Sequence, residues 1–177
     1  RGTVDFALGV ELLGCVGHPS GYGTALRALT DEERPAAASV AGVAMVRMLG
    51  ADAASDLLVA LGRAEGRTGR EGAALGLAEL GERAHAEFVI EAARNGTIGA
   101  RLAARCVARL PFDAPRWLAL LEKESASDRR LATEVVYLLV RRTDQARLDA
   151  LGEAGRAAVR RCLDDAAVYM RSEKREV

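Results

Sequence analysis

Apolar residues along this chain recur at the i, i+3, i+4 and i+7 spacing that is typical of helices packed on one face. One such stripe consists of Ala73, Ala74, Leu77 and Leu80. Glycine, proline and capping residues separate the stripes at regular intervals, and no strand signal lies between them. We therefore predict an all-α fold of helical hairpins joined by short connections.

A block of about thirty residues repeats along the chain, and its clearest copy spans residues 70–95. When the other copies are aligned to it, five apolar residues occupy the same position of the repeat: Leu49, Leu80, Leu110, Val140 and Met170. The first two are 31 residues apart, and each later one follows after 30 residues. A repeat of this length made of two helices is typical of an α-solenoid, whose repeats bury their apolar faces only by stacking.

The repeat predicts a right-handed α-solenoid of about five antiparallel helix pairs plus a terminal helix, forming a single domain over residues 1–177. The regular repeats are 35–66, 67–96, 97–126 and 127–154, with capping units at 1–34 and 155–177. The predicted helices are 3–13, 24–29, 36–49, 53–61, 70–80, 84–94, 98–110, 114–124, 131–140, 144–151 and 155–171.

Glycines and caps predict how neighbouring helices are joined. Gly62, Gly66 and Gly69 form a glycine-rich joint that we interpret as the best candidate for mobility. Asn95-Gly96 is a suitable left-handed stop for a helix, and Thr97 is placed to cap the helix that follows.

The clearest repeat reads REGAALGLAELGERAHAEFVIEAARN, an arginine, two alanines, a leucine and a Leu-Gly pair followed by a second apolar helix. This pattern resembles the HEAT-like repeats of the phycobilisome lyase family, best over residues 70–95 and less closely in the neighbouring units. That broad family includes scaffolds, chromophore lyases and metal-dependent hydroxylases. The resemblance implies helix pairs in a curved stack.

Charge and cysteine content limit the partners and the compartment. Twenty-five basic residues balance 25 acidic ones, so no overall field favours nucleic acid or an anionic membrane. Only two of the basic residues are lysines, which indicates a GC-rich, bacterial genome. The three cysteines, Cys15, Cys106 and Cys162, predict no disulfide framework and fit the reducing cytoplasm. No apolar run is long enough to span a bilayer, so we expect no membrane partner.

Catalytic and metal sites are poorly supported by the residues. A hydroxylase of this repeat class would have pairs of His and Glu, whereas the two histidines, His18 and His85, are far apart in the sequence. Cys15 with His18, or Cys106 with His85, are the candidate nucleophile pairs. Cys106 shares a column of repeat positions with Gly76 and Met45, which predicts a packing role. We therefore expect a protein that is not an enzyme and has no cofactor or metal.

Gly21-Tyr22-Gly23-Thr24 precedes a helix and could present backbone amides to a phosphate. No strand comes before it and no Gly-Lys-Ser or Gly-Lys-Thr occurs in the chain. A turn between two helices explains the glycines without a ligand.

The third, seventh and eleventh places of each first helix are predicted to face solvent on the convex side. In the fourth pair these places hold Arg101, Arg105 and Arg109, a row that could bind phosphates or a partner's carboxylates. The alternative is a solvated helix face partly neutralised by Glu71 and Glu79, which hold equivalent places in the preceding repeat.

The same three places in the fifth pair hold Leu131, Val135 and Leu139, and Tyr169 in the final helix extends this ridge. An exposed apolar ridge needs a cover. A partner protein, a second copy and the C-terminal segment all stay open as that cover.

On the concave side, a column of second-helix positions contains Leu57, Phe88, Leu118 and Leu148, with Trp117 adjacent. Phe88 and Trp117 could anchor a ligand there, although we favour a core role for both. Glu87, Glu91 and Arg116 would give that groove mixed charge.

The leading hypothesis is a non-enzymatic scaffold or adaptor that binds another protein or itself. Nucleic-acid binding is the second, because some DNA glycosylases resemble this repeat class, but zero net charge and convex arginines disfavour it. A chromophore-handling protein that resembles the bilin lyases is the third, with Cys15, His18 and Tyr22 as its residues.

Overall fold

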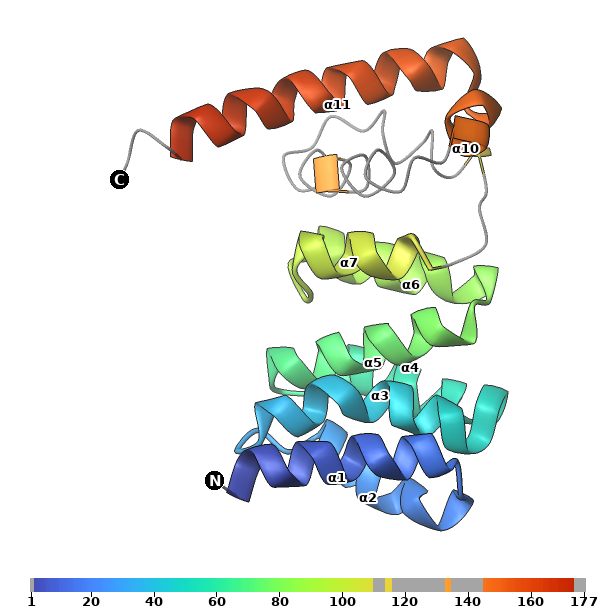
Figure 1. Ribbon diagram of the computed structural model, residues 1–177, viewed down its shortest axis with the longest axis vertical. Helices are drawn as coiled ribbons and strands as arrows, with labels where there is room; N and C mark the ends of the chain where they lie inside the picture. The colour runs from blue at the N-terminus through green and yellow to red at the C-terminus, as the bar shows by residue number, and fades with distance from the viewer. Residues whose placement is uncertain (1, 110–113, 116–132, 135–144, 174–177) are drawn as a thin grey trace. The chain divides into compact units, whose positions relative to one another are not determined.

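The computed structural model describes residues 2–109, 114–115, 133–134 and 145–173, most of which lie in helices (Figure 1). No strand occurs within these ranges, which confirms the predicted all-α class. The chain divides into two compact units, residues 1–110 and 111–177, and each is described by itself. The single repeat domain over residues 1–177 and its right-handed solenoid stay predictions.

Unit 1 contains seven of the predicted helices in their predicted order. Its helices are α1 (Gly2–Val16), η1 (Pro19–Gly21), α2 (Tyr22–Leu29), α3 (Pro35–Leu49), η2 (Gly50–Ala53), α4 (Ala54–Arg63), α5 (Arg67–Leu80), α6 (Arg83–Arg94) and α7 (Ala100–Val107). Every end of the seven α-helices lies within three residues of the prediction, since capping residues and apolar periodicity are local signals.

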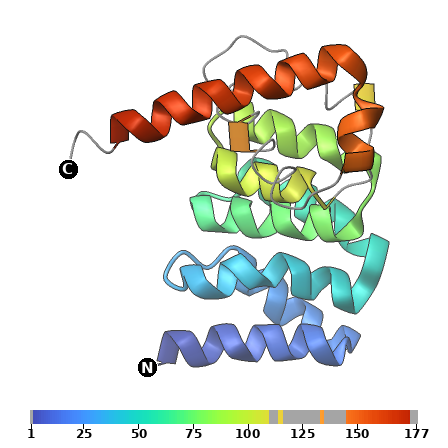
Figure 2. The same cartoon turned by 45° about the horizontal axis from the view of Figure 1, so that its top comes forward.

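The odd-numbered helices of unit 1 pack against one another in series. In this way α1 contacts α3, α3 contacts α5, and α5 contacts α7. Figures 1 and 2 show α1, α3 and α5 in successive layers. The second helices fill the adjoining row, because α2 packs on α3, α4 on α5, and α6 on both α5 and α7. The largest fully buried side chains lie between these helices: Val10, Leu29, Met45, Leu57, Leu77, Val89, Ile98 and Cys106.

Glycines let α3 and α5 approach so closely that backbone meets backbone. A Cβ atom on Gly42 would collide with the carbonyl oxygen of Gly72, and one on Gly72 would collide with that of Ala38. A Cβ on Gly76 would come within 2.7 Å of the Gly42 carbonyl oxygen. These glycines are therefore required for packing, because only hydrogen fits at each site.

The predicted glycine-rich joint is wrong in its extent. Gly62 lies inside α4 and Gly69 inside α5, so only residues 64–66 connect the two helices. Gly69 is buried, and a Cβ there would lie 2.5 Å from the carbonyl oxygen of Leu29. Gly69 thus permits close packing against α2. In the sequence, a glycine needed for packing looks the same as a glycine in a loop.

The connection from α6 to α7 confirms one capping prediction and corrects another. Gly96 has φ of 70°, the left-handed stop expected after α6. Thr97 does not cap α7, whose N-cap is Gly99. The reason is that Ile98 is buried and its amide donates to the Ala92 carbonyl at 3.2 Å, so the turn continues for two more residues.

Unit 2 contains α10 (Gln145–Ala150) and α11 (Gly152–Glu173), which include most of the two predicted C-terminal helices. Gly152, with φ of 67°, separates them. On α11 the buried side chains Ala158, Val159 and Cys162 follow helical spacing. Across the described residues of both units, no helix is long and apolar enough to cross a membrane.

Candidate interaction surfaces

Much of the predicted convex ridge cannot be placed. Leu131, Val135 and Leu139 lie outside the described residues, as do the groove candidates Trp117 and Arg116. Tyr169 lies in α11, but its side chain is outside the described set.

The arginine row lies where the repeat predicted it. Arg101 and Arg105 are exposed on α7, and Arg109 is exposed just beyond the end of that helix. The Arg109 Nη1 lies 3.5 Å from the Glu79 Oε2 of α5. The charge of Arg109 is therefore neutralised by Glu79, as the alternative interpretation of the row expected. Arg101 and Arg105 have no carboxylate partner among the described residues.

Glu71 does not neutralise the arginine row, because it contacts other groups. Its Oε1 accepts from the Arg67 Nε at 2.9 Å and from the Gly99 amide at 3.4 Å. A carboxylate of α5 therefore lies at the start of α7, where the helix dipole favours negative charge.

Cys106 is fully buried, as are Met45 and Gly76 of the same repeat column, which confirms the packing prediction. Burial raises the pKa of Cys106 to about 12, and the nearby Arg109 and Arg105 charges only partly oppose this effect. The thiol therefore stays protonated at neutral pH, and a protonated thiol is a poor nucleophile.

His85, the proposed partner of that thiol, is also buried at 6% exposure. Its Nε2 lies 3.7 Å from the Glu82 Oε2, and its Nδ1 has no hydrogen-bond partner in the described structure. The geometry links His85 to the carboxylate of Glu82, the N-cap residue of α6, and provides no support for a Cys106–His85 pair.

Cys15 and His18 each contact a different neighbour. The Cys15 Sγ, at an exposed site, accepts from the Arg47 Nη1 at 3.7 Å. The His18 Nδ1 accepts the Ser20 amide at 3.2 Å and caps η1. This side chain therefore has a local structural role in the turn.

Tyr22 connects α2 to α4. Its hydroxyl donates to the Asp56 Oδ2 at 2.6 Å. Burial, and then the hydrogen bond and charge of Asp56, raise the pKa of Tyr22 well above its ordinary value. Gly21, just before it, is buried, and a Cβ there would lie 3.1 Å from the Met48 sulfur. These contacts give Gly21 and Tyr22 structural roles without a phosphate.

The core interpretation of Phe88 is wrong. Leu57 of the same predicted column is fully buried, whereas Phe88 is 53% exposed. On α6 the buried positions are His85, Ala86, Val89, Ile90, Ala92 and Ala93. Because α6 packs on both α5 and α7, its buried face is displaced from the column and Phe88 points outward beside the exposed Glu87 and Glu91.

One row of exposed apolar side chains in unit 1 was not predicted from the sequence. Leu8, Leu12 and Val16 are 53%, 55% and 75% exposed and follow one another at four-residue spacing on α1. We call these three residues the α1 ridge. Their spacing is visible in the sequence, but Val10 and Leu13 make the helix apolar on other sides too, so periodicity alone does not select the outer face.

An apolar groove of about 390 Å³ adjoins the α1 ridge on the side of α2. Its lining is Phe6, Gly9, Val10, Leu12, Leu13, Val16 and Thr24. A Cβ atom on Gly9 would meet nothing within 4 Å, so the groove is open above this position. Thr24 is the single polar side chain among the lining residues.

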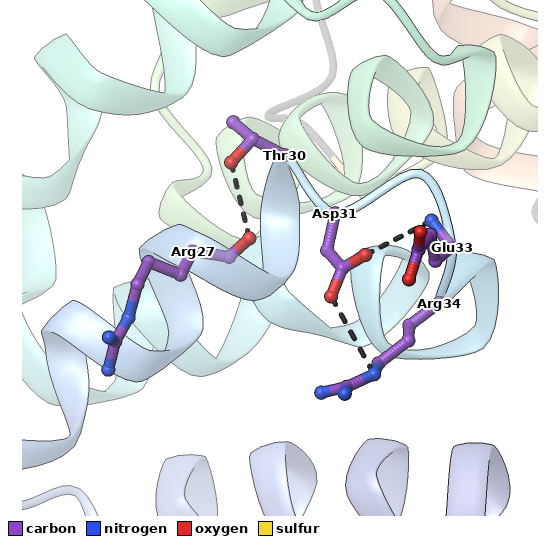
Figure 3. Close-up of polar contacts among 5 residues, drawn as sticks. All are labelled: Arg27, Thr30, Asp31, Glu33 and Arg34. Carbon is purple, nitrogen blue, oxygen red and sulfur yellow. Dashed lines mark hydrogen bonds and ion pairs between the residues drawn. The ribbon is translucent and has the colours of Figure 1, made fainter.

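The turn between α2 and α3 holds one end of this groove in place. The Arg34 guanidinium lies 4.5 Å from the centre of the Phe6 ring, and its Nε is 3.7 Å from the Asp31 Oδ2 (Figure 3). The Asp31 Oδ1 accepts the Glu33 amide at 3.0 Å. These contacts link α1 to the turn and orient the Phe6 side of the groove.

A smaller hollow of about 220 Å³ lies between that turn and the connection from α4 to α5. Asp31 and Glu32 contribute carboxylates to its lining, and Thr30 and Thr68 contribute hydroxyls. No group of three or more His, Cys, Asp or Glu side chains in the described residues could hold a metal ion.

No family model, curated protein or solved structure matches this chain. The case for a function therefore depends on the surfaces described above.

Proposed function

We propose that this protein is a non-enzymatic scaffold of HEAT-like repeats that binds another protein through the α1 ridge. The packing of α1 on α3, α3 on α5 and α5 on α7 supports the stacked-hairpin part of this proposal. The interaction part depends on one observation, which is the exposure of Leu8, Leu12 and Val16 along a single helix face.

Three large apolar side chains in a continuous row are costly to leave in water. Complete burial of such a side chain contributes roughly 1.5–3 kcal/mol, of which the part still exposed, 53–75%, remains to be gained. Contiguous exposed apolar patches commonly mark interaction sites. The adjoining groove enlarges the apolar surface that a partner would cover.

The helix that presents this surface is held firmly from behind. Val10 is buried, and Gly14 lies so close to Ala44 of α3 that a Cβ atom on it would come within 2.8 Å. A surface on a fixed helix loses little conformational freedom when it binds, which favours affinity.

Site-specific photocrosslinking tests the proposal. A photoreactive amino acid replaces Leu12 in one sample and Val59 of α4 in the other, because Val59 has matching exposure at 54%. In cells of the source organism, we expect discrete protein adducts from position 12 that Leu8→Glu removes. Equal adducts from both positions, or none from position 12, would contradict the proposed function.

The predicted ridge of Leu131, Val135 and Leu139 is a second surface within the same proposal. If it binds a second copy, Val135→Glu lowers the mass in solution measured by light scattering. If it binds another protein, Val135→Glu changes the crosslinked adducts. An unchanged mass, together with unchanged crosslinked adducts, would remove this second surface and leave the α1 ridge.

A further inference from the structure

The charged side chains of α1 have one sign. Asp5 and Glu11 are both exposed, and residues 2–16 contain no lysine, arginine or histidine. Helical geometry places Asp5 one turn before Leu8 in the row of the α1 ridge, and Glu11 along the edge of that row. Any molecule that covers the ridge must therefore approach two carboxylates.

Among the described residues, two arginines that lie near α1 contact other groups. Arg47 contacts the Cys15 Sγ at the far end of α1, and Arg34 lies over Phe6 beside Asp31. Within the described part of the chain, neither Asp5 nor Glu11 forms an ion pair. Their charges are available to a partner.

The shape of the surface matches a helix. The α1 ridge runs along a 15-residue helix, and the groove beside it is lined by residues from α1 and by Thr24 of α2. Elsewhere in unit 1, a helix covers the corresponding side of its neighbour; for example, α5 packs on α3. An amphipathic helix docked in an apolar groove is a common way of covering such a face.

We infer that the α1 ridge and its groove bind an amphipathic helix of a partner protein whose apolar stripe is flanked by basic side chains. This inference rests on the proposed function and specifies the partner. A second copy bound through the same face is disfavoured, because each α1 helix would bring carboxylates and no cation to the interface, and uncompensated like charges at an interface are costly.

Two synthetic helical peptides test the inference against the full chain. They share one leucine stripe and differ only in their flanking residues, which are lysine in one and glutamate in the other. By fluorescence anisotropy at physiological salt, we expect the lysine peptide to bind about ten-fold more tightly or better. Leu12→Glu should abolish this binding, whereas Val59→Glu on α4 should leave it unchanged.

Charge reversal gives the sharper comparison. In a variant with Asp5→Lys and Glu11→Lys, the preference should invert towards the glutamate peptide, because the apolar contacts are retained. Circular dichroism confirms that each variant keeps its helix content, and Leu8→Glu provides a second ridge variant if Leu12→Glu does not fold.

Several results would overturn the inference. Equal affinity for the two peptides, or no binding of either, would contradict the inferred basic partner helix. The scaffold proposal is tested separately by the crosslinking experiment. Concentration-dependent self-association that Leu12→Glu removes would identify a second copy as the occupant. An unaltered preference after charge reversal would show that Asp5 and Glu11 do not select the partner.

Discussion

The Glu71 carboxylate of α5 accepts the backbone amide of Gly99, the N-cap of α7, at 3.4 Å. The N-cap residue of α7 is glycine, which has no side chain to accept a hydrogen bond from the amides at the helix start. Glu71 of α5 supplies the acceptor instead. The same oxygen accepts from the Arg67 Nε at 2.9 Å. One side chain therefore connects two successive layers of unit 1.

Glu71→Ala should lower the free energy of unfolding by about 0.5–2 kcal/mol, the usual contribution of an N-cap acceptor. Urea denaturation followed by circular dichroism measures the change. Glu65→Ala is the matched control, since Glu65 is an exposed carboxylate between α4 and α5. Equal losses for the two variants would show that the Glu71–Gly99 contact does not stabilise the fold.

Gly72→Ala should destabilise the protein by about 1–3 kcal/mol, because the new methyl group meets the backbone of Ala38, which cannot move aside without separating α3 from α5. Gly62→Ala is the control, because a Cβ atom there meets nothing within 4 Å. It should stabilise α4 by about 0.4–1 kcal/mol. Thermal unfolding of both variants gives the comparison, and the same sign for both would contradict the packing assigned to Gly72.

Native-state thiol labelling should modify Cys15 and spare Cys106 and Cys162. Cys15 is exposed, whereas the other two are buried. Burial also raises the pKa of Cys106 to about 12, so its thiol is protonated at pH values near 8. Mass spectrometry after treatment with a maleimide should show one adduct in buffer and three in denaturant. Rapid labelling of Cys106 in buffer would contradict its placement in the core.

Tyr22→Phe should cost about 0.5–1.5 kcal/mol at neutral pH, because it removes the hydrogen bond to Asp56. The raised pKa of Tyr22 also has a pH signature. The neutral phenol is favoured in the folded state, so its contribution is complete below the ordinary tyrosine pKa and is lost as pH rises beyond it.

Unfolding free energies measured from neutral to strongly alkaline pH test this signature. The difference between wild type and Tyr22→Phe should shrink once the pH exceeds about 10, the ordinary tyrosine value. A difference that stays constant or grows over that range would contradict the coupling between Tyr22 and Asp56.

The exposed Arg101 and Arg105 should not make this chain a nucleic-acid-binding protein. The net charge is zero and Glu79 already pairs with Arg109. We expect no gel shift with duplex DNA at low ionic strength. A shift that weakens with salt and disappears in Arg101→Glu/Arg105→Glu would instead support the second hypothesis.

Local sequence signals determined the helices of unit 1 and part of their burial. Capping residues and apolar periodicity placed each helix end of unit 1 to within three residues. Counting positions along the repeat also placed Cys106 inside and Arg101 and Arg105 outside, as the structure has them. These properties depend on neighbours along the chain, which the sequence displays directly.

Only tertiary structure decided which face of an ambiguous helix is covered. Both α1 and α6 carry apolar residues on more than one side, and the helices packed against them leave Leu12 and Phe88 in solvent. In the same way, the backbone of α3 makes Gly72 a packing residue, and Glu71 of α5 replaces the expected cap at Thr97. Each outcome depends on contacts between residues far apart in the chain, so no local pattern specifies it.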